Sequence, residues 1–161
     1  MRQQGLDQQK LDPQVQGHSA KPVRPLFVGI YAEEDCKGEV QFSHDWRLKK
    51  NGSIKGNGAI EVPYGTPRSP IHFRLHDDSG RQLKFFQDAK EAIWASVGQC
   101  PCAEGGGGQI EYPDSVAGGN SLKVDNCNSA ECDLHYALRF KDKDNNVVVY
   151  DPVIRNKGGG P

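Results

Sequence analysis

The cysteines are the residues whose spacing comes closest to that of a chemical site. Cys100 and Cys102 enclose one proline, Cys127 and Cys132 enclose four residues, and Cys36 lies far from both pairs. Four thiolates are a suitable tetrahedral ligand set for Zn²⁺, although a C-x-C pair is tighter than the usual spacing of zinc ligands. One interpretation is therefore a zinc site made of both pairs, Cys100, Cys102, Cys127 and Cys132.

Two other interpretations explain the same pairs. Disulfides between the loop of Cys100 and Cys102 and the loop of Cys127 and Cys132 would require an oxidising compartment. Reduced thiols in two loops, with no cofactor and no catalytic duty, require nothing further, and we favour this interpretation. A catalytic thiolate would need a positioned base, and the nearest histidine in sequence, His135, fits the exposed face of a strand better.

A row of basic side chains is the second candidate site. His72, Arg74 and His76 alternate with apolar residues and therefore share one face of a predicted strand. The row would hold a metal with the help of His44 or Asp45, but an arginine between the two histidines would repel a divalent cation. The row therefore favours an acidic partner, and an ordinary solvated sheet face is the alternative interpretation.

Two further segments partly resemble ligand-binding motifs. Asp142, Asp144 and Asn146 begin like a calcium loop, but Val147 stands where such a loop requires glycine. The glycines at residues 105–108 are not followed by the Lys-Ser/Thr of a phosphate-binding loop, so this segment is predicted to be a linker.

The elements that would position these residues are predicted to be short strands. Apolar residues come in brief bursts split by Gly, Pro, Asn and Asp, and residues 71–76 and 134–140 alternate with a period of two. One helical turn is expected at residues 88–94. The predicted strands are residues 26–31, 39–42, 59–62, 71–76, 82–86, 92–97, 122–124, 134–140 and 147–150.

Each of the two alternating strands precedes a polar turn and a further apolar run, which predicts two hairpins. Asp77 and Asp142 begin these turns and lie 65 positions apart. A duplicated sandwich would explain the offset, and recurrent hairpin chemistry explains it more simply. We therefore predict an all-β protein, an antiparallel β-sandwich of the Ig-like or jelly-roll-like kind.

The composition predicts one domain with a tail at each end. The chain has 161 residues, enough for one self-sufficient core. Residues 1–22 are rich in glutamine and poor in aliphatic side chains, which predicts a disordered tail. Residues 23–156 form the predicted sandwich domain, and the glycines in residues 157–161 predict a flexible C-terminal tail.

Charge and hydropathy exclude several classes of protein. Lysine and arginine number 20 against 21 acidic residues, so no net positive field would attract nucleic acid or an anionic membrane. No apolar run approaches the roughly 20 residues that span a bilayer, and residues 1–22 contain no segment of the kind a secretory signal needs. We expect a cytoplasmic protein, or a secreted one if a leader was removed before this numbering begins.

Two parts of the chain resemble a known group of proteins. Residues 69–80 with 92–94, and residues 134–140 with the closing Y-D-P-V-I-R-N of residues 150–156, are similar to small uncharacterised bacterial β-rich proteins that end in Y-D-P-x-I-x-N. The resemblance implies a β fold and supplies no activity or catalytic residue. Because proline cannot donate to a ladder, Pro152 is expected to end the last strand, with Ile154 tucked back under the sandwich.

No acid, base and nucleophile converge in the sequence, so a non-enzymatic function is expected. The module would bind a protein partner or assemble with itself through an exposed face or strand edge. One alternative is a small metal-dependent or hydrolytic enzyme that uses the cysteine pairs or the row of His72 and His76. The other is a secreted, disulfide-stabilised adhesion or toxin-related domain.

Overall fold

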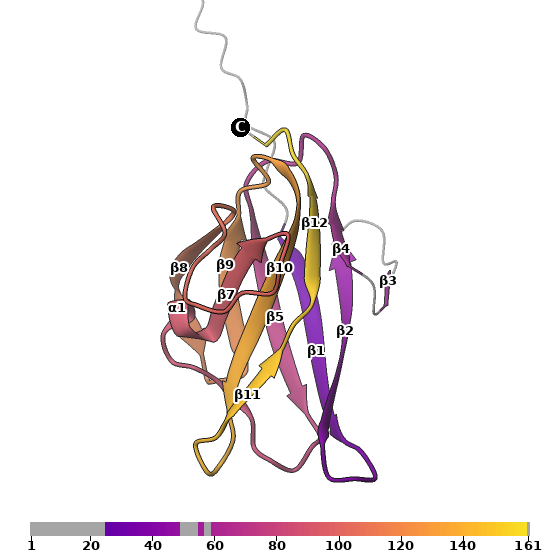
Figure 1. Cartoon of the computed structure of the whole chain (residues 1–161), viewed down its shortest axis with the longest axis vertical. Helices are drawn as coiled ribbons and strands as arrows, with labels where there is room; N and C mark the ends of the chain where they lie inside the picture. The colour runs from indigo at the N-terminus through magenta and orange to yellow at the C-terminus, as the bar shows by residue number, and fades with distance from the viewer. Residues whose placement is uncertain (1–24, 49–54, 57–58, 161) are drawn as a thin grey trace, which may run out of the picture.

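The computed structural model describes residues 25–48, 55–56 and 59–160, which form two β-sheets that face each other (Figure 1). The predicted tail at residues 1–22 lies outside the described residues. The first sheet has the spatial order β3 (Lys55–Gly56), β2 (Val40–Leu48), β1 (Leu26–Glu34), β5 (Ser69–Asp77), β9 (Ser121–Asn126) and β8 (Ile110–Ala117). The second sheet has the order β11 (Val147–Tyr150), β10 (Glu131–Lys141), β12 (Val153–Lys157) and β4 (Ile60–Val62), with β6 (Lys84–Phe85) and β7 (Ile93–Val97) also paired to β10. The prediction of an all-β sandwich is confirmed.

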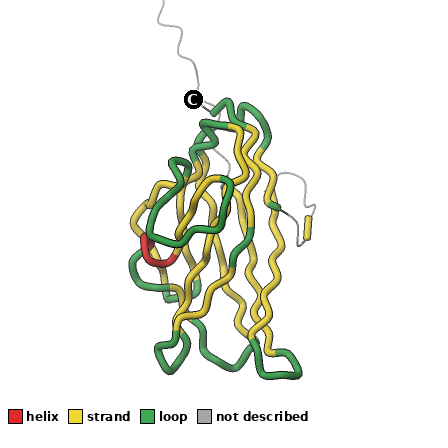
Figure 2. Tube along the Cα trace, viewed as in Figure 1, coloured by secondary structure: helices red, strands yellow, loops and turns green. Residues whose placement is uncertain are grey.

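Loops gather at the two ends of the sandwich, and one helical turn, α1 (Ala89–Ala92), lies at its side (Figure 2). The side chain of Asp88 accepts a hydrogen bond from the backbone N–H of Lys90 and so caps this turn. The helical turn that the sequence predicted within residues 88–94 is therefore confirmed.

Alternating side chains of both sheets fill the space between them. In β5 the apolar residues are buried while His72, Arg74 and His76 face outward, and β10 buries Leu134, Tyr136, Leu138 and Phe140. Across the interior, the rings of Phe73 and Tyr136 lie 5.6 Å apart between centroids. The period of two that the sequence showed in these stretches thus marks the inner faces of two facing sheets.

The predicted hairpin after β5 is wrong. β5 lies in the first sheet, whereas β6 pairs with β10 in the second, so the connecting segment crosses from one sheet to the other. Phe85 of β6 is buried with its ring 4.7 Å from that of Phe140, and this contact holds β6 in the second sheet. The carboxylate of Asp77 closes the crossing segment by accepting from the backbone N–H groups of Ser79 and Leu83.

The second predicted hairpin is confirmed, because β10 and β11 pair antiparallel. Asp142 accepts hydrogen bonds from the backbone N–H of Asp144 and of Asn146, each at 2.8 Å, and from the Asn146 side chain. The segment that resembled a calcium loop is therefore a hairpin turn, in which the Asp142 carboxylate accepts hydrogen bonds from backbone N–H groups of the turn.

Two of the strand pairs are parallel, which the antiparallel prediction did not include. β1 pairs parallel with β5, and β12 pairs parallel with β4. In both pairs the two strands are separated in the chain by several other strands. Parallel pairing requires such a long crossover connection. The pairing of β1 with β5 is the one that matters for the candidate site.

Asn128 ties the end of the chain to the sandwich. Its side-chain amide donates to the carbonyl oxygens of Pro63, Thr66 and Gly158 at 3.1, 3.1 and 3.2 Å, and its oxygen accepts from the N–H of Gly158 at 3.0 Å. β12 also extends to Lys157. The last strand thus runs one residue past the predicted domain boundary at residue 156, and the backbone of Gly158, within the segment 157–161 predicted to be flexible, is bonded to a buried asparagine.

Tyr136 offers a test of the core. Its hydroxyl is buried and has no hydrogen-bond partner within the described residues, and burial raises the pKa of the phenol well above its ordinary value. An unpaired buried hydroxyl costs free energy that phenylalanine does not. Tyr136→Phe is expected to raise the free energy of unfolding by about 1 kcal/mol in urea denaturation. A loss of stability would show that the hydroxyl is paired in solution.

Candidate functional site

The predicted basic row lies on the outer face of the first sheet. The parallel register of β1 and β5 places His72 beside Phe27, Arg74 beside Gly29, and His76 beside Tyr31. Side chains at alternate positions of neighbouring strands share a face, so the residues of β1 that accompany the row are two aromatics with a glycine between them.

Each histidine of the row contacts an aromatic ring. The rings of Phe27 and His72 meet edge to face with centroids 5.1 Å apart, and those of Tyr31 and His76 stack at 4.9 Å with an interplanar angle of 11°. These two ring pairs stand on either side of Gly29 and form the walls of a depression in the sheet surface.

Gly29 lies at the base of this depression, beneath the side chains of Asp45 and Tyr31. A Cβ at this position would lie 2.5 Å from Asp45 Oδ1 and 3.0 Å from the hydroxyl oxygen of Tyr31, so those side-chain oxygens occupy the space above the glycine. Asp45 lies opposite Gly29 on β2, and the Tyr31 hydroxyl donates to Asp45 Oδ2 at 3.4 Å. Glycine within a strand often marks such a close approach.

The result is a pocket of about 330 Å³, called here the outer-face pocket, lined by Phe27, Val28, Gly29, Tyr31, Asp45, His72, Arg74 and His76. All three residues of the predicted row line it. The sequence analysis considered Asp45 only as a metal ligand and did not find the residues of β1. Glycine at an outward position between two aromatic ones was the signal that could have found them.

The outer-face pocket contains one positive group, Arg74, which can bind an anion, and one negative group, Asp45, which can accept hydrogen bonds. Arg74 is exposed and forms no ion pair with any described residue, whereas Asp45 provides a carboxylate across the glycine. Burial, and then the positive charge of Lys123, lower the pKa of His72 below its ordinary value. Neutral imidazole at pH 7 can both donate and accept a hydrogen bond.

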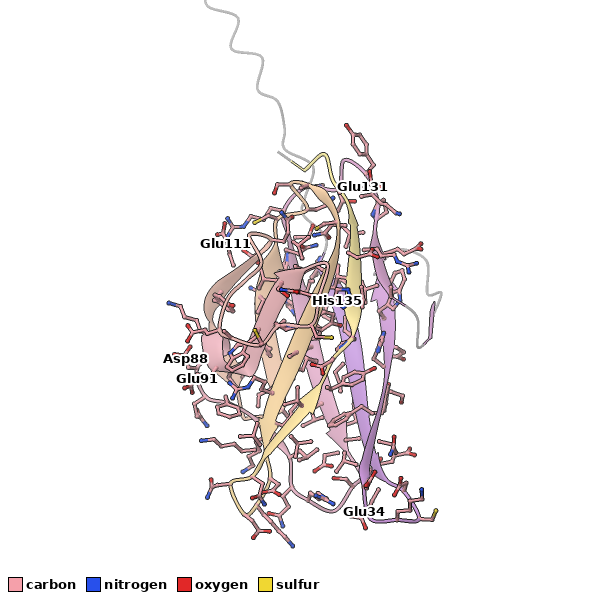
Figure 3. All side chains as sticks on the ribbon, viewed as in Figure 1. Glu34, Asp88, Glu91, Glu111, Glu131 and His135 are labelled. Carbon is pink, nitrogen blue, oxygen red and sulfur yellow. The ribbon has the colours of Figure 1, made fainter. Side chains whose placement is uncertain are left out.

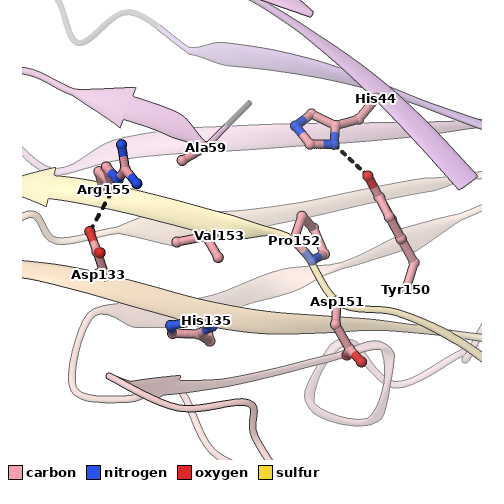
Figure 4. A pocket seen from close by; sticks show the side chains of 9 residues that line it. All are labelled: His44, Ala59, Asp133, His135, Tyr150, Asp151, Pro152, Val153 and Arg155. Atoms are coloured by element: carbon pink, nitrogen blue, oxygen red, sulfur yellow. Dashed lines mark hydrogen bonds and ion pairs between the residues drawn. The ribbon is translucent and has the colours of Figure 1, made fainter. Parts of the chain in front are cut away.

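A second pocket, of about 410 Å³, lies where β11 continues into β12 (Figure 4). His44 Nδ1 lies 2.6 Å from the Tyr150 hydroxyl, a contact that joins β2 of the first sheet to β11 of the second. Burial raises the pKa of Tyr150 and of Asp151. The lining residues are His44, Ala59, Asp133, His135, Tyr150, Asp151, Pro152, Val153 and Arg155.

Most polar groups of this second pocket are already bonded to one another. Arg155 Nε lies 3.4 Å from Asp133 Oδ1, and the Tyr150 hydroxyl is engaged by His44 (Figure 4). His135 projects from β10 on the outer face of the second sheet (Figure 3). Neither this lining nor that of the outer-face pocket contains a serine, threonine or cysteine, so neither holds the usual nucleophile of a hydrolase.

The cysteines are not joined in disulfides and are not grouped around a metal position among the described residues. All five are free, and burial raises the pKa of both Cys127 and Cys132, the opposite of what an activated thiolate requires. Cys132 packs against the core, while Cys100 and Cys102 are exposed after β7. Within the described residues, no three His, Cys, Asp or Glu side chains are grouped to hold a metal. The structure thus supports neither the zinc site at Cys100, Cys102, Cys127 and Cys132 nor a disulfide pairing.

Comparisons with known proteins assign no family. No protein-family model matches the chain, and no curated protein is similar to it at a significant level. Among the described residues, none of the helical structure is long and apolar enough to cross a bilayer.

Proposed function

We propose that this protein is a non-enzymatic binding module that holds a carboxylate-bearing ligand in the outer-face pocket. The observation that carries the proposal is the pairing of β1 with β5, which places Arg74 beside Gly29. Arg74 is exposed and lines the outer-face pocket, so its guanidinium group is accessible to a ligand. Arginine recognises carboxylates through two parallel hydrogen bonds, which supplies both affinity and orientation.

The enzyme alternative has less support in the described residues. A small hydrolase that used the cysteines or the row of His72 and His76 would need a nucleophile near a base. The cysteines lie outside both pockets, and the row contacts aromatic rings rather than a hydroxyl or thiol nucleophile. The same residues serve a binding site well, because aromatic walls exclude water from a charged contact.

Self-association is the second candidate, and the strand β11 favours it. Val147 and Val149 are 51% and 44% exposed, and among the described strands β11 pairs with β10 alone. An unpaired edge with exposed valines can pair with the edge of another copy. A monomeric mass at all concentrations in analytical ultracentrifugation would exclude this candidate and leave the binding proposal intact.

The binding proposal is tested by titrating the ¹⁵N-labelled full chain with three carboxylate probes: acetate, L-glutamate and methyl β-D-glucuronide. At least one probe is expected to shift the amide resonances of β1 and β5 saturably, and Arg74→Ala should remove these shifts. Arg155→Ala is the control, since Arg155 is an arginine on the second sheet. If no probe shifts these amides, or if Arg74→Ala leaves the shifts unchanged, the proposal is wrong.

A further inference from the structure

We infer that the outer face of the second sheet is a docking surface for an acidic segment of a partner protein that also carries aliphatic side chains. The surface, called here the cationic face, consists of Lys84, Arg139, Lys141, Val147 and Val149. It belongs to the other sheet of the sandwich from the outer-face pocket, so the inference goes beyond the proposed function and does not depend on it.

The register of β10 brings the residues of the cationic face together. On one side of β10, Arg139 pairs with Val149 of β11. Two residues further along, Lys141 pairs with Val147 of β11 and, on its other side, with Lys84 of β6. Directly paired residues point to the same side of a sheet, and the alternate residues of β10 fill the core. Three cations and two valines therefore share the surface that is turned away from the core.

Aromatic rings hold two of the cations in place. The guanidinium carbon of Arg139 lies 3.8 Å from the centre of the Trp94 ring and 4.5 Å from that of the Phe86 ring. Lys141 Nζ lies 4.7 Å from the centre of the same Phe86 ring, and Arg139 Nη1 donates to the carbonyl oxygen of Glu91 at 2.9 Å. Contacts with aromatic rings orient a guanidinium group without neutralising its charge. Arg139 is thus positioned in advance for a carboxylate.

The positive charge of the cationic face is not compensated within the described residues. Lys84 and Lys141 are like charges at directly paired positions, an arrangement that destabilises a sheet. Neither they nor Arg139 form an ion pair with any described residue, and the exposed carboxylates of Asp88 and Glu91 at the neighbouring α1 are no exception (Figure 3). By contrast, three other arginines each have an acidic partner: Arg68, Arg81 and Arg155. A partner with carboxylates would supply the missing negative charge.

The valines border the cations along an open strand edge. Val147 and Val149 are 51% and 44% exposed, and β11 pairs with β10 alone among the described strands. The edge strand β8 contains Pro113 and a shift of register, two features that hinder pairing with another chain. β11 is a run of three valines and a tyrosine with neither feature. Its edge and its valines are therefore open to a partner that carries aliphatic side chains.

Charge and ring contacts favour an acidic protein segment over two other occupants. A second copy of the chain would bring the same cations to the interface, and like charges repel. Single-stranded nucleic acid binds by stacking its bases on open aromatic rings, but Arg139 already lies over the rings of Trp94 and Phe86, and Phe86 is only 8% exposed. A segment with alternating acidic and aliphatic side chains can pair with the cations and cover the valines together.

The experiment titrates the ¹⁵N-labelled full chain with three short peptides of equal length: one alternates Glu with Val, one Glu with Ser, and one Lys with Val. The Glu/Val peptide is expected to shift the amide resonances of β10 and β11 saturably. The Glu/Ser peptide lacks the aliphatic contact and should bind roughly tenfold more weakly. The Lys/Val peptide should not bind. Salt at about 0.5 M should weaken binding of the Glu/Val peptide at least about threefold, because salt screens exposed ion pairs.

A charge variant separates docking from a structural role. Lys84→Glu turns the like-charge pair with Lys141 into an opposite-charge pair, so the thermal unfolding midpoint should stay level or rise. The same change should weaken binding of the Glu/Val peptide at least about fivefold. Lys157→Glu is the control, because it makes the same change of net charge on an exposed residue of β12. It should leave peptide binding within about twofold of the wild type.

A valine variant tests the apolar part of the surface. Val149→Thr keeps the shape of the side chain and its preference for a strand, but replaces a methyl group with a hydroxyl. It should weaken binding of the Glu/Val peptide about threefold, whereas binding of the Glu/Ser peptide should be unchanged. Val97→Thr is the control, since Val97 is a valine of similar exposure, 52%, at the end of β7.

Several results would overturn the inference. It is wrong if the Glu/Val peptide leaves β10 and β11 unshifted, or if the Lys/Val or Glu/Ser peptide binds as tightly. Tighter binding of oligothymidylate than of the Glu/Val peptide would assign the cationic face to nucleic acid instead. A dimer that the Glu/Val peptide does not dissociate in analytical ultracentrifugation would assign the valines to a second copy. None of these results concerns the amides of β1 and β5, which report on the outer-face pocket, so the two proposals can fail separately.

Discussion

Replacing Asn128 with alanine is expected to lower the free energy of unfolding by about 3 kcal/mol or more. The buried Asn128 side chain makes four hydrogen bonds, and its loss leaves the N–H of Gly158 and the carbonyl oxygens of Pro63 and Thr66 without this partner. Alanine is also strained at this position, because the backbone has φ 49°, in the left-handed region that asparagine tolerates better.

Urea denaturation of the full chain measures this effect, and two glycine variants separate its causes. Asn128→Gly keeps the positive φ and loses the hydrogen bonds, so it should remain strongly destabilised. Asn145→Gly is the matched control, since Asn145 has φ 63° in an exposed turn and its side chain bonds to no other segment that the structure describes. Wild-type stability of Asn128→Gly would contradict the assignment of the loss to the side-chain hydrogen bonds.

The fold class could be predicted because period-two alternation is a local property of the sequence. The strands expected at residues 71–76 and 134–140 lie within β5 and β10, and the strand expected at residues 147–150 matches β11. What sequence could not provide was the sheet to which each strand belongs. The segment after β5 reads like the one after β10, yet the burial of Phe85 against Phe140 places its strand in the other sheet.

The last strand was missed because of Pro152. Leu138 of β10 pairs with Tyr150 of β11, and His135, three residues earlier on β10, pairs with Val153 of β12, three residues after Tyr150. β11 and β12 therefore pair with β10 in one continuous register. Proline interrupts only the donors, and the carbonyl of Pro152 still accepts from the N–H of Tyr136. The expectation that Asp151 and Pro152 would end the strand is confirmed, because β11 ends at Tyr150, but the sequence did not predict that a new strand, β12, begins directly afterwards at Val153.

The strand β8 was also not predicted, because it contains a proline, Pro113. Proline within a run argues against a central strand, and β8 is an edge strand of the first sheet, where proline is tolerated. The register of β8 against β9 also shifts between Glu111 and Ser115. A bulge of this kind breaks the alternation that the sequence analysis relied on.

Half of the candidate site could be predicted and half could not. His72, Arg74 and His76 share a strand, so their common face follows from the sequence. Gly29 and Asp45 lie on other strands, and their meeting depends on the parallel pairing of β1 with a strand that follows more than 30 residues later. Such long-range pairing has no local signal.

The closing Y-D-P-x-I-x-N stretch, which carried a resemblance in sequence, has structural contacts along its length. Tyr150 bonds to His44 of the opposite sheet, and Ile154 is fully buried in the core, as expected. The final residue, Asn156, is also buried and bonds to Asn126 of the first sheet. The stretch thus joins the second sheet to the first at two places and supports the fold.

The pair of Asn126 and Asn156 is expected to be strongly coupled. Each amide donates to the other, at 2.7 and 3.0 Å, and Asn156 also donates to Gln109 Oε1 at 3.3 Å. Either alanine variant leaves a buried amide without its main partner and should cost about 2–3 kcal/mol of unfolding free energy.

The double-mutant cycle tests this coupling. Asn126→Ala and Asn156→Ala combined should cost less than the sum of the two single variants by about 1–2 kcal/mol, because the second change removes a group that the first has already left unpaired. A cycle of Asn126→Ala with Lys157→Ala is the control, since Lys157 is exposed on the same strand as Asn156. The control pair should be additive in urea denaturation. If the asparagine pair is additive as well, the two sheets are not held together by this contact, and the buried amides must be satisfied by other groups.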